Sequence, residues 1–192
     1  GQNFHRSNFR FNFDSYIWRP SFVVRPSFPW FYIAGADPAD YPGTRIDLAE
    51  QTLPLPYAMP ALVLLAATAA GGALWRWPGA RLPLAVLLLG TLPMSLALFT
   101  AIAISHRYTA DFIPPLLASA AFGIISLPAL PPGLRRLLGA LAVVLAVVAV
   151  PITLAITLHY QGELVWGVPD EIRGQYLSLR QQFDAFLATS RP

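Results

Sequence analysis

The densest group of ionisable side chains in the apolar part of the chain is SHRYTADF, residues 105–112. Arg107 and Asp111 stand four positions apart, the spacing at which opposite charges pair along a helix. His106 and Tyr108 lie beside them, and a guanidinium can also hold a phosphate through two parallel hydrogen bonds. The cluster therefore predicts either a structural ion pair or a phosphate or lipid-headgroup site. No second acid or set of metal ligands accompanies Asp111, so we assign no catalytic residue.

The other polar residues add no recognisable reaction centre. His106 and His159 fall near predicted helix ends, where histidine more often interacts with the helix dipole than ligates haem or a pigment. The acids of the loop 34–56 do not follow the spacing of a calcium-binding loop, and the chain has no cysteine. We therefore expect no metal and no cofactor. The basic residues are all arginines and are scattered along the chain, which argues against a nucleic-acid partner.

Composition indicates a membrane protein. Of the 192 residues, 55% are hydrophobic and only 12% are charged, about half the charge of an average soluble domain. Four stretches are long and apolar enough for a bilayer, which needs about 20 helical residues. They are residues 57–75, 82–105, 108–130 and 137–159. Because residues 137–158 carry no charge, this segment lacks the polar stripe of a soluble helix.

The predicted fold is therefore an all-α integral membrane protein with four transmembrane helices. An exported aromatic and proline-rich segment, residues 1–56, precedes the membrane domain 57–159, and an exported helical tail, 160–192, follows it. Lipids are the expected partners on this ground, together with other membrane-protein subunits.

Arginines in the short connections predict the orientation. Arg76 and Arg81 follow the first span, and Arg135 and Arg136 precede the fourth. Positively charged connections face the cytoplasm, so both termini are expected on the periplasmic side of a bacterial inner membrane. An exported N-terminus must be carried across the membrane, and we therefore expect further sequence before Gly1.

The N-terminal segment opens with an aromatic–polar alternation, NFRFNFD at residues 8–14. A helix would gather four of the bulky side chains in one stripe: Phe9, Phe13, Tyr16 and Ile17. It would turn Phe11 away and would end before Trp18. Tryptophans such as Trp18 and Trp30 settle at the level of lipid headgroups. We expect an interfacial anchor, and a ligand-binding lid made of the same aromatics is the alternative.

The C-terminal tail predicts an amphipathic helix that begins near Pro169. Its apolar positions step by four and three residues: Ile172, Tyr176, Leu179, Phe183 and Phe186. The helix is expected to lie on the outer membrane surface, against the N-terminal aromatic segment, or against a partner protein. Aspartate at positions 179 and 183 is expected to detach it.

Several stretches resemble parts of large bacterial polytopic membrane proteins of the glycosyltransferase-C type. SHRYTADFIPPLLASAAFG at 105–123 resembles an RY-x-x-DF-x-P-x-L stretch of that family, and WGVPDEIRGQYLSLRQQFDAFL at 166–187 is similar to a short exported tail. YIWRPSF and FPWF are similar to the exported region before the last spans. The resemblance implies a polyprenyl-phosphate sugar donor with Arg107 as its phosphate contact. The catalytic acid of the family usually lies in an early exported loop, for which this chain shows no counterpart.

Without a complete site, the chain is expected to be a structural or accessory subunit that packs against a larger membrane complex and lipids. The alternative is the C-terminal segment of a glycosyltransferase-C-like enzyme that uses polyprenyl-phosphate sugar donors. Whether the chain is an enzyme stays open at this point.

Overall fold

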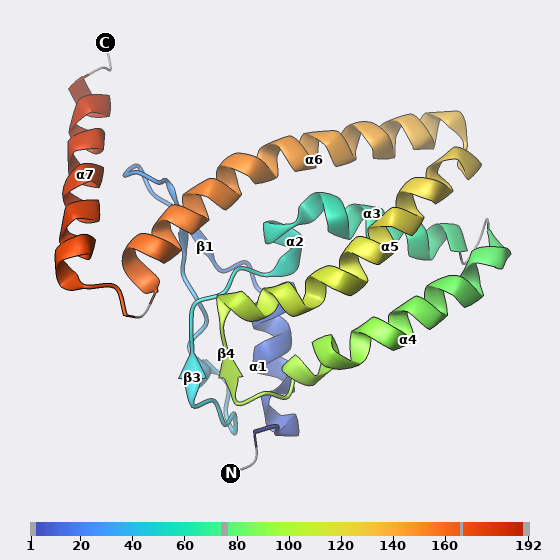
Figure 1. Cartoon of the computed structure of the whole chain (residues 1–192), viewed down its shortest axis with the longest axis horizontal. Coiled ribbons are helices and arrows are strands. Elements are labelled where there is room, and N and C mark those ends of the chain that lie inside the picture. The colour runs from blue at the N-terminus through green and yellow to red at the C-terminus, as the bar shows by residue number, and fades with distance from the viewer. Residues whose placement is uncertain (1–2, 74–76, 166, 190–192) are drawn as a thin grey trace.

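The computed structural model describes residues 3–73, 77–165 and 167–189. The fold is mostly helical, and its long helices run side by side between two ends (Figure 1). Three helical segments of the described chain are long and apolar enough to cross a membrane: Pro78–Leu98, His106–Ala129 and Pro132–Leu164. They contain α4 (Arg81–Leu98), α5 (Ile113–Ser126) and α6 (Pro132–His159), respectively. Three of the four predicted spans thus have membrane-length counterparts.

The first predicted span, 57–75, is interrupted. It consists of α2 (Leu55–Ala58) and α3 (Pro60–Gly71), with a break at Met59. Pro60 lacks an N–H and disfavours helical geometry in the residue before it, which explains the break. The 12 residues of α3 rise about 18 Å, short of the roughly 30 Å of a bilayer core. Trp75 and Arg76 lie outside the described residues.

The second predicted span ends seven residues early, at Leu98 rather than Ser105. The Asn12 side-chain amide donates to the carbonyls of Leu98 and Ala101, at 2.9 Å each, and so satisfies backbone groups that a helix end leaves open. The chain then turns into β4 (Ala103–Ile104), which pairs in parallel with β3 (Leu48–Ala49). This pairing brings the residues after both strands, Glu50 and Ser105, next to each other.

The third predicted span begins as a 3-10 helix, η6 (His106–Phe112), and continues as α5. Pro114 and Pro115 occupy the first turn of α5, where a missing N–H costs little. Helix α5 packs closely on α3. A Cβ atom at Gly123 would stand 2.0 Å from the Leu65 carbonyl oxygen, so only glycine allows this approach of the two backbones.

The N-terminal segment is helical, as predicted, and Tyr16, Phe13 and Ile17 of the predicted stripe pack in or against the core. The prediction that Phe11 points away is wrong. Helical turns run through η1 (Arg6–Asn8), α1 (Phe9–Phe13) and η2 (Asp14–Trp18). Phe11 is 0% exposed, whereas Phe9 is 50% exposed. The inward face also carries Asn8 and Asn12, both fully buried. Asn8 donates to the carbonyls of Arg45 and Ala101 and accepts from the Arg45 N–H. Hydrogen bonding to backbone, not apolar content, selects this face.

The main buried cluster joins this N-terminal helix to the ends of the long helices. Phe11 and Tyr16 pack with Phe99 after α4 and with Phe112 before α5. Phe13 packs against the same cluster from its edge. We call the part of the molecule formed by the N- and C-terminal segments the head. This cluster, its core, lies beside the ends of the long helices rather than between them.

A hairpin follows, made of β1 (Phe22–Val24) and β2 (Phe31–Ile33) in antiparallel register, with Val23 opposite Tyr32. Its tip contacts the C-terminal helix α7 (Asp170–Thr189). The Phe28 ring packs edge-on against Phe183 at 4.8 Å between centroids, and the Phe28 N–H donates to Asp184 Oδ1 at 2.7 Å. The predicted helix is therefore docked on the N-terminal aromatic segment.

Arg173 and Arg180 also hold α7 in place. The Arg173 guanidinium donates to the carbonyls of Gly162, Glu163 and Val165, at the end of the π-helical turn η8 (Tyr160–Leu164) that extends α6. Arg180 pairs with the Glu163 carboxylate. These contacts place α7 across the end of α6 (Figure 1).

The predicted apolar stripe of α7 is only partly used in this docking. Tyr176 packs on Gly162 of η8, and Phe183 contacts the hairpin while 40% of it stays exposed. Three positions seven residues apart are more than half exposed: Ile172, Leu179 and Phe186. Leu179 is 65% exposed, so the docking of α7 on the hairpin depends on Phe183 rather than on Leu179. That Leu179 anchors the helix to the membrane surface or to a partner protein stays a prediction.

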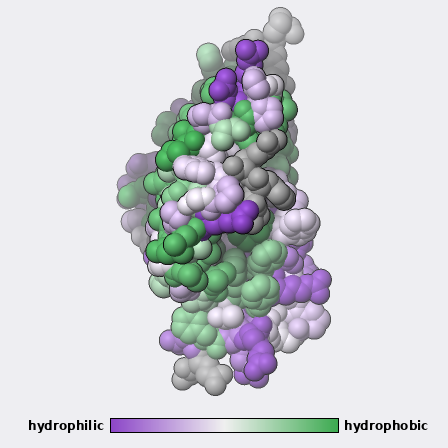
Figure 2. Space-filling view, turned by 90° about the vertical axis from the view of Figure 1, so that its right-hand side faces the viewer, coloured by the Kyte–Doolittle hydropathy of each residue, from purple (hydrophilic) through white to green (hydrophobic). Residues whose placement is uncertain are grey.

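Both terminal segments lie at the same end of the long helices, with the N-terminus at the bottom left and the C-terminus at the top left of Figure 1. The connections next to Arg81 and to Arg135 and Arg136 lie at the other end. Viewed from that end, apolar residues cover much of the flanks, and hydrophilic residues gather in separate patches (Figure 2).

We predict that Gly123→Ala separates α3 from α5. The added methyl group meets the Leu65 backbone, which cannot rotate away, so the free energy of unfolding should fall by at least about 2 kcal/mol. Thermal unfolding in detergent micelles measures this loss. Gly139→Ala is the matched control, since a Cβ there meets nothing within 4 Å. Equal stability of the two variants would refute the close α3–α5 approach.

We predict that Phe183→Asp loosens α7 and that Leu179→Asp does not. The first change removes the ring contact with Phe28, whereas the second adds a charge to an exposed side chain. Trypsin cleavage after Arg173 and Arg180 reports undocking, because both guanidinium groups are held by η8. We expect cleavage about three to ten times faster for Phe183→Asp, in line with the strength of an aromatic pair. Faster cleavage of Leu179→Asp alone would contradict this docking.

Candidate functional site

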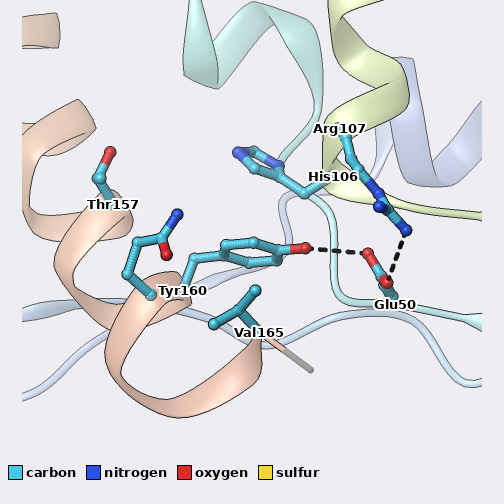
Figure 3. A pocket seen from close by; sticks show the side chains of 7 residues that line it. Glu50, His106, Arg107, Thr157, Tyr160 and Val165 are labelled. Carbon is cyan, nitrogen blue, oxygen red and sulfur yellow. Dashed lines mark hydrogen bonds and ion pairs between the residues drawn. The ribbon is translucent and has the colours of Figure 1, made fainter. Parts of the chain in front are cut away.

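A group of converging polar side chains lines a cavity of about 370 Å³ at the end of α6. Three separate segments build it: the residue after β3, the start of η6, and the last turns of α6 with η8. Its lining residues are Glu50, His106, Arg107, Thr157, Tyr160, Gln161 and Val165. Figure 3 shows the Glu50, Arg107 and Tyr160 side chains pointing toward one another.

Glu50 is the centre of this arrangement. Its Oε2 atom accepts a hydrogen bond from the Tyr160 hydroxyl at 3.0 Å and another from the Ser105 hydroxyl. Its Oε1 atom stands 3.7 Å from a terminal nitrogen of Arg107 (Figure 3). The Glu50 side chain is 14% exposed, so these partners replace most of the water around its charge.

Arg107 lies at the outer edge of the cavity, with 71% of its side chain exposed. Its Nε–H donates to Ser105 Oγ at 3.3 Å. The terminal nitrogen that faces Glu50 is beyond hydrogen-bond length. The guanidinium is therefore oriented by the site but keeps capacity to bind a further group.

His106 and Tyr160 form the aromatic side of the cavity, with 5.4 Å between ring centroids. His106 Nδ1 is buried and has no hydrogen-bond partner among the described residues. A buried ring nitrogen without a partner is costly.

Tyr16 supports the site through hydrogen bonds to the backbone of Ser105. Its hydroxyl accepts from the Ser105 N–H at 3.2 Å and donates to the Ser105 carbonyl at 3.4 Å. Burial raises the pKa of Tyr16 well above its ordinary value, so the hydroxyl stays protonated at physiological pH. Ser105 is thereby fixed between Tyr16 and Glu50, and the chain direction into η6 is fixed with it.

Of the four candidate residues predicted from the sequence, His106 and Arg107 line the cavity. Tyr108 instead packs against the main buried cluster. Asp111 does not line the cavity, and its carbonyl accepts a hydrogen bond from Ser95 Oγ at 2.6 Å. The ion pair expected between Arg107 and Asp111 is replaced by the contact with Glu50.

Glu50, Tyr160 and Ser105 were missed as members of the site. Glu50 was recognised only as one of the loop acids, and nothing in its local sequence points to a partner beyond residue 100. Its one useful signal is that it is a lone acid that follows an apolar pair, Leu48–Ala49, in a segment able to form a strand.

His159, the other histidine considered as a ligand, lies away from this cavity. The His159 ring packs against Tyr32 at 4.7 Å between centroids, and its Nδ1 is 3.3 Å from Glu163 Oε1. Across the described residues, no three histidine, cysteine or acidic side chains gather as a metal site. The structure thus assigns His159 to the docking of α7, and His106 to the cavity.

Comparison with family models, curated proteins and solved structures found no match to this chain.

We predict that Glu50→Ala destabilises the head by about 1–3 kcal/mol, the usual cost of leaving buried donors without an acceptor. Ser105 and Tyr160 lose their shared partner in this variant. Glu50→Gln should cost clearly less, because an amide oxygen still accepts both bonds and the exposed Arg107 charge remains hydrated. Chemical unfolding in detergent micelles checks the order. A loss as large for the glutamine variant as for the alanine variant would contradict it.

Proposed function

We propose that this chain is a multi-pass membrane protein of a bacterial inner membrane. Its α4, α5 and α6 helices cross the bilayer, and its N- and C-terminal segments form a head on the periplasmic side. Support comes from the three membrane-length apolar helices and from the arginines at the end opposite the head. Short positively charged connections stay in the cytoplasm.

The observation that carries the proposal is the exposure of α6. Only 11% of the 18-residue apolar stretch of this segment is buried. A soluble monomer rarely exposes so large a continuous apolar surface. Exposed side chains lie on several faces of the helix, including Leu137, Val144, Val147 and Val150. Lipid or neighbouring membrane helices would cover them.

We infer an accessory or structural role within a larger membrane assembly as the primary function. Two exposed apolar surfaces at different depths favour it: the flanks of α4 and α6, and the line Ile172, Leu179 and Phe186 on α7. Lipid alone suffices for the first surface. The second belongs to the head, where a partner subunit would cover it.

A second candidate is the C-terminal part of a glycosyltransferase-C-like enzyme with polyprenyl-phosphate sugar donors. One observation favours it. Arg107, the phosphate contact that the motif resemblance implies, is exposed at the edge of the 370 Å³ cavity and is oriented by Ser105. Within the described residues the site holds one carboxylate, Glu50, which is already hydrogen bonded.

The membrane topology can be tested with single cysteines, because the chain has none of its own. We expect a membrane-impermeant maleimide to label Asp37→Cys and Ser178→Cys from the periplasmic side and Gly133→Cys from the cytoplasmic side. All three positions are exposed. Val144→Cys is the control that should stay unlabelled in the bilayer. Labelling of positions 37 and 133 from the same side would overturn the proposed topology.

The accessory role and the enzymatic role predict different companions. Gentle extraction should yield an accessory subunit together with other membrane proteins, and Leu179→Asp should release them. Extraction of a protein that carries only lipid, with no change on Leu179→Asp, would contradict the accessory role.

A further inference from the structure

The charges of the Glu50–Arg107 cavity match a zwitterion rather than an anion. One carboxylate and one guanidinium face the same space (Figure 3), so their formal charges cancel. A phosphate alone would meet the Glu50 charge beside Arg107 and be repelled by it. A group that carries a phosphate and an ammonium a few bonds apart would satisfy both side chains.

Both charges retain free bonding capacity. The Oε2 atom of Glu50 is occupied by Tyr160 and Ser105, whereas Oε1 has, among the described residues, only the 3.7 Å contact with Arg107. The Nε–H group of Arg107 donates a hydrogen bond to Ser105 Oγ. An ammonium on Oε1 and a phosphate on the terminal guanidinium nitrogens would form charge-assisted bonds that are stronger than this loose ion pair.

The length of α6 sets the depth of the cavity. The segment Pro132–Leu164 has 33 residues and is about 50 Å long at 1.5 Å per residue. A span of about 20 residues that starts after Arg136 leaves the hydrocarbon near Ile156. Thr157 and Tyr160, which line the cavity, therefore stand at the level of lipid headgroups. This step rests on the proposed membrane topology.

A mostly apolar face of α6 leads from the cavity into the membrane. It is shallow and is formed by Ala146, Ala149, Val150, Thr153, Leu154 and Thr157. Thr157 belongs to both this face and the cavity lining. A polar chamber at headgroup depth beside an apolar helix face matches the two parts of an amphiphile.

We propose that this site binds one zwitterionic glycerophospholipid with an ethanolamine headgroup. Its ammonium bonds to Glu50 Oε1, its phosphate bonds to Arg107, and one acyl chain lies along the apolar face of α6. The contact is non-covalent, and the lipid is unchanged by it.

The experiment uses the full chain, with any companions it retains, in nanodiscs or micelles. These contain equal amounts of phosphatidylethanolamine and phosphatidylglycerol of the same acyl chains. Native mass spectrometry measures the ratio of the two lipids retained. The wild-type protein should retain phosphatidylethanolamine at least about tenfold over phosphatidylglycerol, roughly the contribution of one charge-assisted bond.

Glu50→Gln is the decisive variant. It keeps the hydrogen-bond acceptor but gives the cavity a net positive charge, so retention should shift at least about tenfold toward phosphatidylglycerol. Asp47→Asn is the matched control. It removes the same charge from an exposed position three residues away in the same loop and should leave the ratio unchanged. Circular dichroism and size-exclusion chromatography verify that each variant is folded.

A separate arm tests the apolar face of α6. Ala149→Phe should place a bulky ring in the path of the acyl chain and lower phospholipid retention while soluble phosphoethanolamine still binds. Val148→Phe, on the opposite side of α6, is its control. Equal or stronger wild-type retention of phosphatidylglycerol, or the same ratio in Glu50→Gln and wild type, overturns the lipid site. A protein that is stable and monomeric without detergent overturns the membrane topology itself, so the two failures are distinct.

Discussion

The head of this protein depends on one carboxylate that three distant segments share. Glu50 comes from the loop before α2, Ser105 directly follows strand β4, and Tyr160 comes from the extension of α6. Because the carboxylate is mostly shielded from water, each segment is needed to keep the others' polar groups satisfied. The parallel pairing of β3 with β4 sets the register at which this meeting occurs, and Tyr16 holds it from the opposite side.

The long helices follow from local sequence, because apolar content over 20 or more residues has few other physical outcomes. Their ends do not. Pro60 divides the first predicted span, and the Asn12 side chain gives α4 its end at Leu98. Both effects involve single residues, and the second comes from a residue 86 positions away. Hydropathy averages over a window and cannot register either one.

The candidate site was half predictable for the same reason. His106 and Arg107 stand out because charged groups are rare in apolar sequence, and both line the cavity. Local spacing selected Asp111 as the partner of Arg107, whereas the chain supplies Glu50 through strand pairing. The buried face of the N-terminal helix was also set by distant contacts. A search for apolar stripes chose Phe9 over Asn8, and yet the amide is buried because it bonds to the turn after α4 and to Arg45.

The position of Arg173 has a thermodynamic consequence. This side chain belongs to α7, but it bonds to the carbonyls that close the turn carrying Tyr160. That turn and the tail helix consequently gain order together. By linkage, any molecule that stabilises the tail alters occupancy of the cavity, and any occupant of the cavity alters the affinity of the tail by an equal factor. Helix α7 supplies none of the described residues that line the cavity. Its docking would nevertheless change the affinity of the proposed lipid site, and a bound lipid would change the docking of α7.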